Sequence, residues 1–225
     1  MTLPDTGTVE YRQTRFAPPP GATVILLVRH GESAPARPGQ SFPLVLGRGD
    51  PELASYGVEQ AKRVCARLAR GKVDAIYVTP LRRTQQTAAP LASATGLTPV
   101  VVEDLIEVGL GEWEGGLFRQ RVAENHPIAV RMREEERWDV IPGGESTEDL
   151  LARTHRAISR IAADHPDQQV AVFAHGGVIG AILADAANSR QFAFSGADNG
   201  SLSVLVVTRD RWIIRSYNDT SHLED

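Results

Sequence analysis

The sequence is short of cysteine, of long apolar runs and of aromatic side chains. Its 225 residues include a single cysteine, Cys65, which excludes a disulfide within the chain and gives no sign of an oxidising compartment. The first apolar run, residues 24–28, is far shorter than the ~20 residues of a membrane helix. The N-terminus contains no apolar stretch of signal-peptide length. We therefore expect a cytoplasmic protein without a membrane partner.

The chain also lacks a surplus of positive charge. Its net charge is −4, so nothing in the overall electrostatics favours nucleic acid or an anionic membrane as a partner. Hydrophobic residues make up 42% of the chain, enough for one substantial core. We expect an extended N-terminal arm over residues 1–21, which ends in three prolines, and a single domain over 22–225. The sequence leaves open whether the protein is a monomer or a homodimer.

Apolar runs alternate with helical patterns along the rest of the chain. This alternation predicts an α/β fold, a three-layer sandwich with a mostly parallel central sheet and helices on both faces. The final apolar segment, 201–218, reads as two strands around a turn and suggests one antiparallel strand near the C-terminus. Residues 105–145 are expected to form a cap or insertion. Pro90 should kink or divide the helix predicted over 81–96.

Two segments share one design, in which a buried strand is followed by histidine and then glycine. They are "VILLVRHGES", with Arg29, His30 and Gly31, and "VAVFAHGGVIG", with His175 and Gly176. Ligands of parallel α/β sheets sit beyond the carboxyl ends of the strands, so both histidines should face one crevice. The glycines let backbone amides approach a ligand, and the helix that begins after His175 favours an anion.

The other polar residues near this crevice indicate a phosphate site. Arg29 offers a planar donor fork suited to phosphate. Arg82 and Arg83 follow a further strand, and only one of two successive helical residues can face the crevice easily. A carboxylate from "DLIEVGLGEWEGG" could supply a proton, and Ser33 could either donate to the phosphate or cap the turn. A two-histidine metal enzyme is disfavoured because no carboxylate cluster stands at ligand spacing.

Five motifs in this order, "LLVRHGES", "TPLRRTQQTA", "LIEVGLGEWEG", "PGGES" and "VFAHGG", resemble the histidine phosphatase superfamily, the phosphoglycerate mutase-like proteins. The resemblance covers roughly residues 23–220. It implies that the enzyme transfers a phosphoryl group to a histidine without a metal or an organic cofactor. By the same resemblance, His30 is the nucleophile, Glu107 the general acid and base, and the phosphate is held by Arg29, Arg83 and His175, with close approach at Gly31 and Gly176.

Departures from the mutase pattern favour a phosphatase that acts on a small phosphorylated metabolite. Mutases of the family carry an asparagine near the position of Ala36, and Asn-Ser where this chain has Gly177 and Val178. The insertion before "PGGES" is also shorter than theirs. A cofactor-dependent phosphoglycerate mutase remains the alternative, and an inactive phosphate-binding module a remote one. In the unusual segment 34–57, the substrate-facing candidates are Phe42, Leu44 and Arg48.

Overall fold

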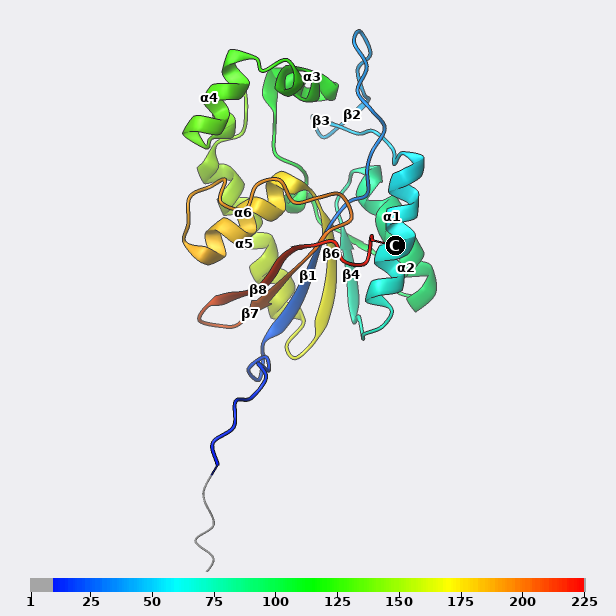
Figure 1. Cartoon of the computed structure of the whole chain (residues 1–225), viewed down its shortest axis with the longest axis vertical. Helices are drawn as coiled ribbons and strands as arrows, with labels where there is room; N and C mark the ends of the chain where they lie inside the picture. The colour runs from blue at the N-terminus through cyan, green and yellow to red at the C-terminus, as the bar shows by residue number, and fades with distance from the viewer. Residues whose placement is uncertain (1–9, 225) are drawn as a thin grey trace, which may run out of the picture.

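A six-stranded sheet runs through the centre of the computed structural model, which describes residues 10–224 (Figure 1). Its strand order is β5-β4-β6-β1-β7-β8. β7 pairs antiparallel with both of its neighbours, and the other pairs are parallel. The predicted sheet, mostly parallel with one antiparallel strand near the C-terminus, is therefore confirmed. The strands are β1 (Thr23–Arg29), β4 (Ala75–Val78), β5 (Val100–Val101), β6 (Gln169–Ala174), β7 (Leu202–Val207) and β8 (Trp212–Asp219).

β1 is buried on both faces because helices cover both faces of the sheet. Ile25 and Leu27 belong to the core cluster formed with helices α5 and α6. Leu26 and Val28 belong to the cluster formed with helices α1 and α2. This explains the uninterrupted apolar run, since each face of the strand meets a core. The three-layer prediction is confirmed by α1 (Ser55–Leu68), α2 (Arg82–Thr95), α5 (Thr147–Asp164) and α6 (Gly176–Ala187).

The structure departs from the sequence prediction in two of these elements. Pro90 does not divide α2, which continues through it as one helix. Buried Ala88 and Leu91 hold this part of the helix against the sheet, and their packing offsets the hydrogen bond that proline cannot donate. The apolar residues of 98–103 predict a strand, but the strand observed there is only the two residues of β5, whose valines are exposed at the edge of the sheet.

Two segments lie above the carboxyl ends of the strands and cap them (Figure 1). One is a hairpin made of β2 (Leu44–Val45) and β3 (Arg48–Gly49). The other spans 103–140 and has its own apolar cluster around Trp113 and Met132. Its elements are the 3₁₀ helices η1 (Glu103–Leu105), η2 (Gly111–Gly116) and η3 (Trp138–Val140) and the helices α3 (Leu117–Ala123) and α4 (Pro127–Glu135).

The chain before β1 is exposed and contains neither helix nor strand over residues 10–19. Its one close ring contact is with the sheet, where the Arg215 guanidinium carbon lies 3.9 Å from the centre of the Phe16 ring. Residues 1–9 of the expected arm, and the end of the domain at Asp225, lie outside the described residues, so the domain boundaries stay a prediction. No helix within 10–224 has both the length and the apolar character to cross a membrane.

Candidate active site

Three neighbouring strands end at one point beneath the cap and deliver its polar side chains. β1 ends before His30, β6 before His175 and β4 before Thr79. The two imidazole rings meet edge to face with their centres 5.2 Å apart. His30 is 4% exposed and His175 is fully buried. The prediction that both histidines share one crevice agrees with this geometry.

The hydrogen bonds of His30 determine which ring nitrogen can react. Its Nδ1 lies 2.7 Å from the carbonyl oxygen of Gly31, an acceptor only, so Nδ1 carries the proton and donates it. Nε2 therefore keeps its lone pair, which accepts a hydrogen bond from Arg83 Nε at 3.1 Å. Burial, with the charges of Arg83 and Arg29, holds the pKa of His30 well below its usual value. The ring is thus neutral, with its free lone pair on Nε2.

His175 and Arg29 leave buried polar atoms without a hydrogen-bond partner. His175 Nε2 lies 3.0 Å from Thr79 Oγ1, while its Nδ1 has no partner among the described residues. The Nε of Arg29 is likewise unpaired, and its Nη1 donates to the Ala197 carbonyl. Burial lowers the pKa of His175 well below its usual value. A buried polar atom without a hydrogen-bond partner costs free energy. An anion beside His30 would give a partner to both His175 Nδ1 and Arg29 Nε.

Arg83 is the member of the arginine pair that faces the crevice. Besides its bond to His30, it donates from Nη1 to the Gly49 carbonyl at 2.8 Å. Burial lowers the pKa of Arg83 to about 10, which leaves the guanidinium charged at neutral pH. Arg82 points outward, where its Nε donates to Asp50 at 2.9 Å. The expectation that only one of the two faces the crevice is met by Arg83.

Glu107 lines a cavity of about 230 Å³ together with His30, Arg29 and Arg83. Its Oε1 accepts a hydrogen bond from the Val108 amide at 2.9 Å, and its Oε2 has no bonded partner within residues 10–224. A Cβ at Gly177 would lie 2.9 Å from Oε1 and 2.6 Å from a Val108 methyl carbon. The absence of a side chain at position 177 therefore leaves room for the carboxylate.

Two other acidic residues near Glu107, Glu114 and Asp104, are engaged elsewhere. Glu114 also lines the cavity, but its two oxygens accept the backbone amides of Leu110 and Gly49, each at 2.8 Å. Asp104 forms an ion pair with Arg156 at 2.8 Å. Glu107 is therefore the carboxylate in this stretch that combines a place in the cavity with a free oxygen.

The structure gives Gly31 a different role from the predicted one. Its amide donates to Thr87 Oγ1 at 3.0 Å, so it does not face the crevice as a phosphate donor. A Cβ at Gly31 would lie 2.4 Å from the Gly57 carbonyl oxygen, so glycine is required by the packing of α1. At Gly176, the first residue of α6, a Cβ would lie 3.3 Å from Arg29 Nε, and the approach of its backbone to a phosphate stays a prediction.

Ser33 lies in the same groove but is engaged by the cap. Its side-chain oxygen accepts a hydrogen bond from Arg119 Nη2 at 2.7 Å. Ser33 also forms an isolated bridge with Leu53. The hydroxyl hydrogen remains available, so donation to a phosphate stays a prediction.

The cap supplies residues that the sequence analysis did not single out. Arg119 lines the cavity from α3, and Phe118 and Trp138 form an aromatic wall with ring centres 6.0 Å apart. From the sequence, the segment that contains Arg119 is recognisable only as a charged helix, because the spacing of its charges does not show which charge faces a cavity. Of the candidate substrate-facing residues, Phe42 and Arg48 line the cavity, whereas Leu44 points to solvent and is 56% exposed as a residue.

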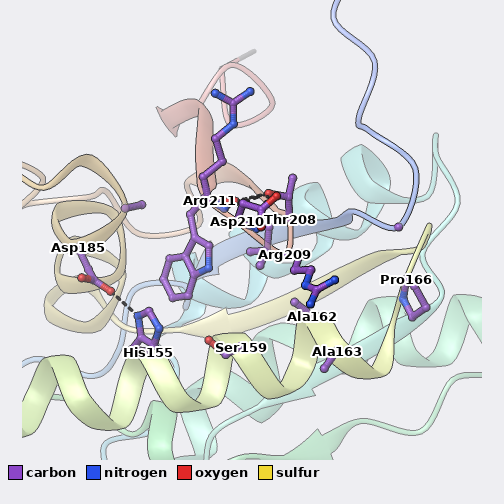
Figure 2. Close-up of a pocket in the computed structure, with 14 residues that line it drawn as sticks. His155, Ser159, Ala162, Ala163, Pro166, Asp185, Thr208, Arg209, Asp210 and Arg211 are labelled. Atoms are coloured by element: carbon purple, nitrogen blue, oxygen red, sulfur yellow. Dashed lines mark hydrogen bonds and ion pairs between the residues drawn. The ribbon is translucent and has the colours of Figure 1, made fainter.

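A second hollow of about 720 Å³ lies away from this site, between α5 and the turn that joins β7 to β8 (Figure 2). His155 Nδ1 lies 2.8 Å from an Asp185 oxygen there, and its ring stacks on Trp212 at 4.6 Å. The residues that line this hollow include none that line the cavity at His30. The candidate active site is therefore the smaller cavity, where the two buried histidines and the arginines converge.

Comparison with known proteins agrees with the geometry. Over 203 residues the chain is 34% identical to phosphoserine phosphatase 1 of Hydrogenobacter thermophilus, covering 88% of this chain and 93% of that protein. It is also 34% identical to a metal-independent phosphoserine phosphatase of Arabidopsis thaliana, covering 89% and 83%. A solved mycobacterial glucosyl-3-phosphoglycerate phosphatase superposes with a TM-score of 0.75 at 28% identity, covering 88% of this chain and all of that one.

The family model of the histidine phosphatase superfamily, branch 1, matches residues 25–220, a range that contains both buried histidines, the arginines and the cap. The strand order, the histidines at the strand ends and this match lead to one conclusion: the chain belongs to the histidine phosphatase superfamily.

Proposed function

We propose that the protein hydrolyses small phosphomonoesters through a phosphohistidine at Nε2 of His30. The observation that carries the proposal is a buried, neutral imidazole whose Nε2 lone pair faces Arg83, beside the unpaired donors of Arg29 and His175. A neutral imidazole with one free lone pair can attack phosphorus without first losing a proton. The family relationship supports the same class of reaction.

In the first step, the Nε2 lone pair attacks phosphorus and the bond from phosphorus to the ester oxygen breaks. Glu107 gives its proton to the departing alkoxide, so the alcohol leaves neutral. The Nδ1 proton stays on the ring, and the Gly31 carbonyl stabilises the positive charge that develops there. Arg83 transfers its hydrogen bond from Nε2 to a phosphate oxygen as the new bond forms.

In the second step, Glu107 takes a proton from water while the water oxygen attacks phosphorus and the phosphorus–nitrogen bond breaks. Inorganic phosphate leaves, and His30 regains its Nε2 lone pair. Arg29 and Arg83 stabilise the charge on the equatorial oxygens in both steps. Because His30 and Arg83 are buried, this stabilisation is stronger than it would be in bulk solvent.

Hydrolysis is preferred over phosphoryl isomerisation because the chain differs from mutases at positions that surround the phosphate. Ala36, in the groove beside His30, has no polar group to hold a departing sugar acid. At Gly177 the Glu107 carboxylate and the Val108 side chain occupy the space that an asparagine would need. A cofactor-dependent mutase is the alternative reaction, and both rest on the same phosphohistidine.

The experiment is phosphate release from 4-nitrophenyl phosphate in the presence of a chelator, with alkaline denaturation to trap a phosphoenzyme that is stable in base and lost in acid. His30→Ala should abolish both signals. Glu107→Gln should slow turnover and, with an activated aryl leaving group, allow the phosphoenzyme to accumulate. His155→Ala, on the far hollow, is the matched control and should leave activity unchanged.

Full turnover by His30→Ala would overturn the mechanism. The choice between hydrolysis and isomerisation is tested with 3-phosphoglycerate, with and without a bisphosphoglycerate primer. Phosphate release without isomerisation is the expected result. Isomerisation without phosphate release would establish the mutase reaction in its place.

A further inference from the structure

Arg119 occupies the place where two hollows of the site meet. The inner cavity of about 230 Å³ and an adjoining outer groove of about 800 Å³ are both lined by Arg29, His30 and Arg119. Arg29 and His30 come from the sheet, whereas Arg119 comes from α3 in the cap above it (Figure 1). Its charge is close enough to contribute to the lowered pKa of His30. Arg119 therefore lies beside both the inner cavity and the outer groove.

The guanidinium of Arg119 is held in place by neutral groups. Nη1 donates to the Ala34 carbonyl at 2.8 Å and Nη2 to Ser33 Oγ at 2.7 Å. The guanidinium carbon lies 5.7 Å from the centre of the Phe42 ring. Within residues 10–224 no carboxylate lies within 4.0 Å of it. The side chain is therefore oriented without a carboxylate in contact with it, although the charge of Glu32, which lines the outer groove, attracts it from farther away.

The other cations that line the inner cavity already have partners or a place on the phosphate. Arg29 and Arg83 flank His30 and serve the transferred phosphoryl group. Arg48 donates to the Glu107 carbonyl at 2.9 Å and lies 3.6 Å from Glu145. The guanidinium of Arg119 has five N–H donors. Two are used by the hydrogen bonds to Ala34 and Ser33, and three remain. A planar carboxylate can accept two of these side by side.

We propose that Arg119 binds a carboxylate on the leaving group of the substrate and so selects phosphorylated carboxylic acids over simple phosphate esters. This specificity rests on the proposed phosphatase reaction and adds to it a second recognition point, separate from the phosphate. Ser33 is then a positioning residue, because its hydroxyl orients the guanidinium and need not touch the substrate.

The test compares O-phosphoserine with O-phosphoethanolamine, which differ only in the carboxylate. In the unaltered enzyme, kcat/KM should be higher for phosphoserine. Arg119→Gln should reduce this preference about 10-fold or more, through a higher KM for phosphoserine, because it removes a charge-assisted hydrogen-bond pair. The kcat/KM for phosphoethanolamine should change less than about 3-fold, which also shows that the variant is folded. Arg121→Gln is the matched control, since Arg121 lies on the same helix and pairs with Glu124 outside both hollows.

An equal loss for both substrates would overturn the proposal, because it would place Arg119 on the phosphoryl group instead. An unchanged preference in Arg119→Gln, or no preference in the unaltered enzyme, would overturn it too. Each of these results still requires phosphate release from at least one ester. Failure to hydrolyse 4-nitrophenyl phosphate as well as both of these esters would instead contradict the proposed function itself.

Discussion

The reactive nitrogen of His30 is selected by one backbone carbonyl. Because Gly31 O accepts the Nδ1 proton, the lone pair is fixed on Nε2 before any substrate arrives. The neighbouring arginines add to this effect, since a cationic imidazole beside two guanidinium groups would be repelled by both. The His30 ring thus stays neutral, with a free Nε2 lone pair, over a wider pH range than an exposed histidine would.

The ring protonation of His30 can be measured directly. Its lowered pKa predicts a neutral ring with a protonated Nδ1 at pH 6, below the usual value of ~6.5. The measurement is the ¹⁵N chemical shift of the ring nitrogens as a function of pH. Arg83→Met should raise the pKa of His30, because the charge of Arg83 is the next cause after burial. A ring that is fully cationic at pH 6 in the unaltered protein would contradict this picture.

For single residues, the sequence was enough to predict the candidate site residues at the strand ends, but not Arg119 in the cap. His30 and His175 follow buried strands, so their common edge could be predicted from the parallel sheet alone. Arg83 was chosen over Arg82 by family register, and burial agrees. Arg119 could not be found this way, because its position depends on how α3 folds back over the sheet. The Gly31 amide was misassigned because its partner, Thr87, comes from a different helix.

Among the elements, α1 supports the loop that carries His30. Gly57, in the first turn of α1, packs against that loop so closely that a Cβ there would lie 2.0 Å from the Glu32 carbonyl oxygen. Gln60 Oε1 accepts the Glu32 amide at 2.8 Å, and Gln60 Nε2 donates to the Asn199 carbonyl. The helix therefore fixes the loop by contact and by hydrogen bonds together.

Gly57→Ala tests this contact. In a helix alanine is favoured over glycine by about 1 kcal/mol, so without the clash the variant would be more stable. Because the clash is with backbone, we expect a net loss of about 1–3 kcal/mol and a fall in kcat/KM as the loop shifts. Urea unfolding and phosphate release measure the two effects. Gly71→Ala is the control, since its Cβ meets nothing closer than 3.6 Å; equal behaviour of the two variants would contradict the argument.

The long amphipathic elements were predicted well, and the short ones were not. The apolar stripe over 146–166 predicts a helix, which is observed as α5, with Ser146 as its cap accepting the Asp149 amide at 3.1 Å. The break near Pro127 correctly separates α3 from α4. β5 is an edge strand that pairs with β4 over two residues only, and apolar composition alone does not reveal how far the pairing extends.

For the whole molecule, the two buried histidines link stability to pH. Both have a folded-state pKa well below the unfolded value of ~6.5, so below pH 6.5 the unfolded chain binds more protons than the folded one. Stability is then fully present above ~6.5 and falls as the pH drops below it. Each histidine contributes a slope of about 1.4 kcal/mol per pH unit until the folded form also titrates.

The prediction is a lower free energy of unfolding at pH 5 than at pH 7.5, measured by urea unfolding. In a variant with both His30→Gln and His175→Gln, this difference should shrink by about 2 kcal/mol or more. Glutamine retains polar character but does not titrate in this range. An unchanged pH dependence in the double variant would assign the acid sensitivity to other groups.

The order of the strands is the part of the whole fold that the sequence could not supply. β1 lies between β6 and β7, which follow it by well over a hundred residues. The apolar runs 23–29 and 169–175 indicate that each of these strands is buried. They do not indicate which strands pair with one another. The α/β class follows from local patterns, whereas the pairing depends on how the helices pack against both faces.

The division of the site between a sheet floor and a separate cap has a practical consequence for directed evolution. Arg29, His30 and His175 lie at the carboxyl ends of strands that belong to the two main cores. Randomising these three residues would therefore change folding and chemistry at once. Arg119 and Phe42 sit in segments outside those two clusters. A combinatorial library confined to those two positions should therefore yield mostly folded, active clones that differ in which alcohol they release.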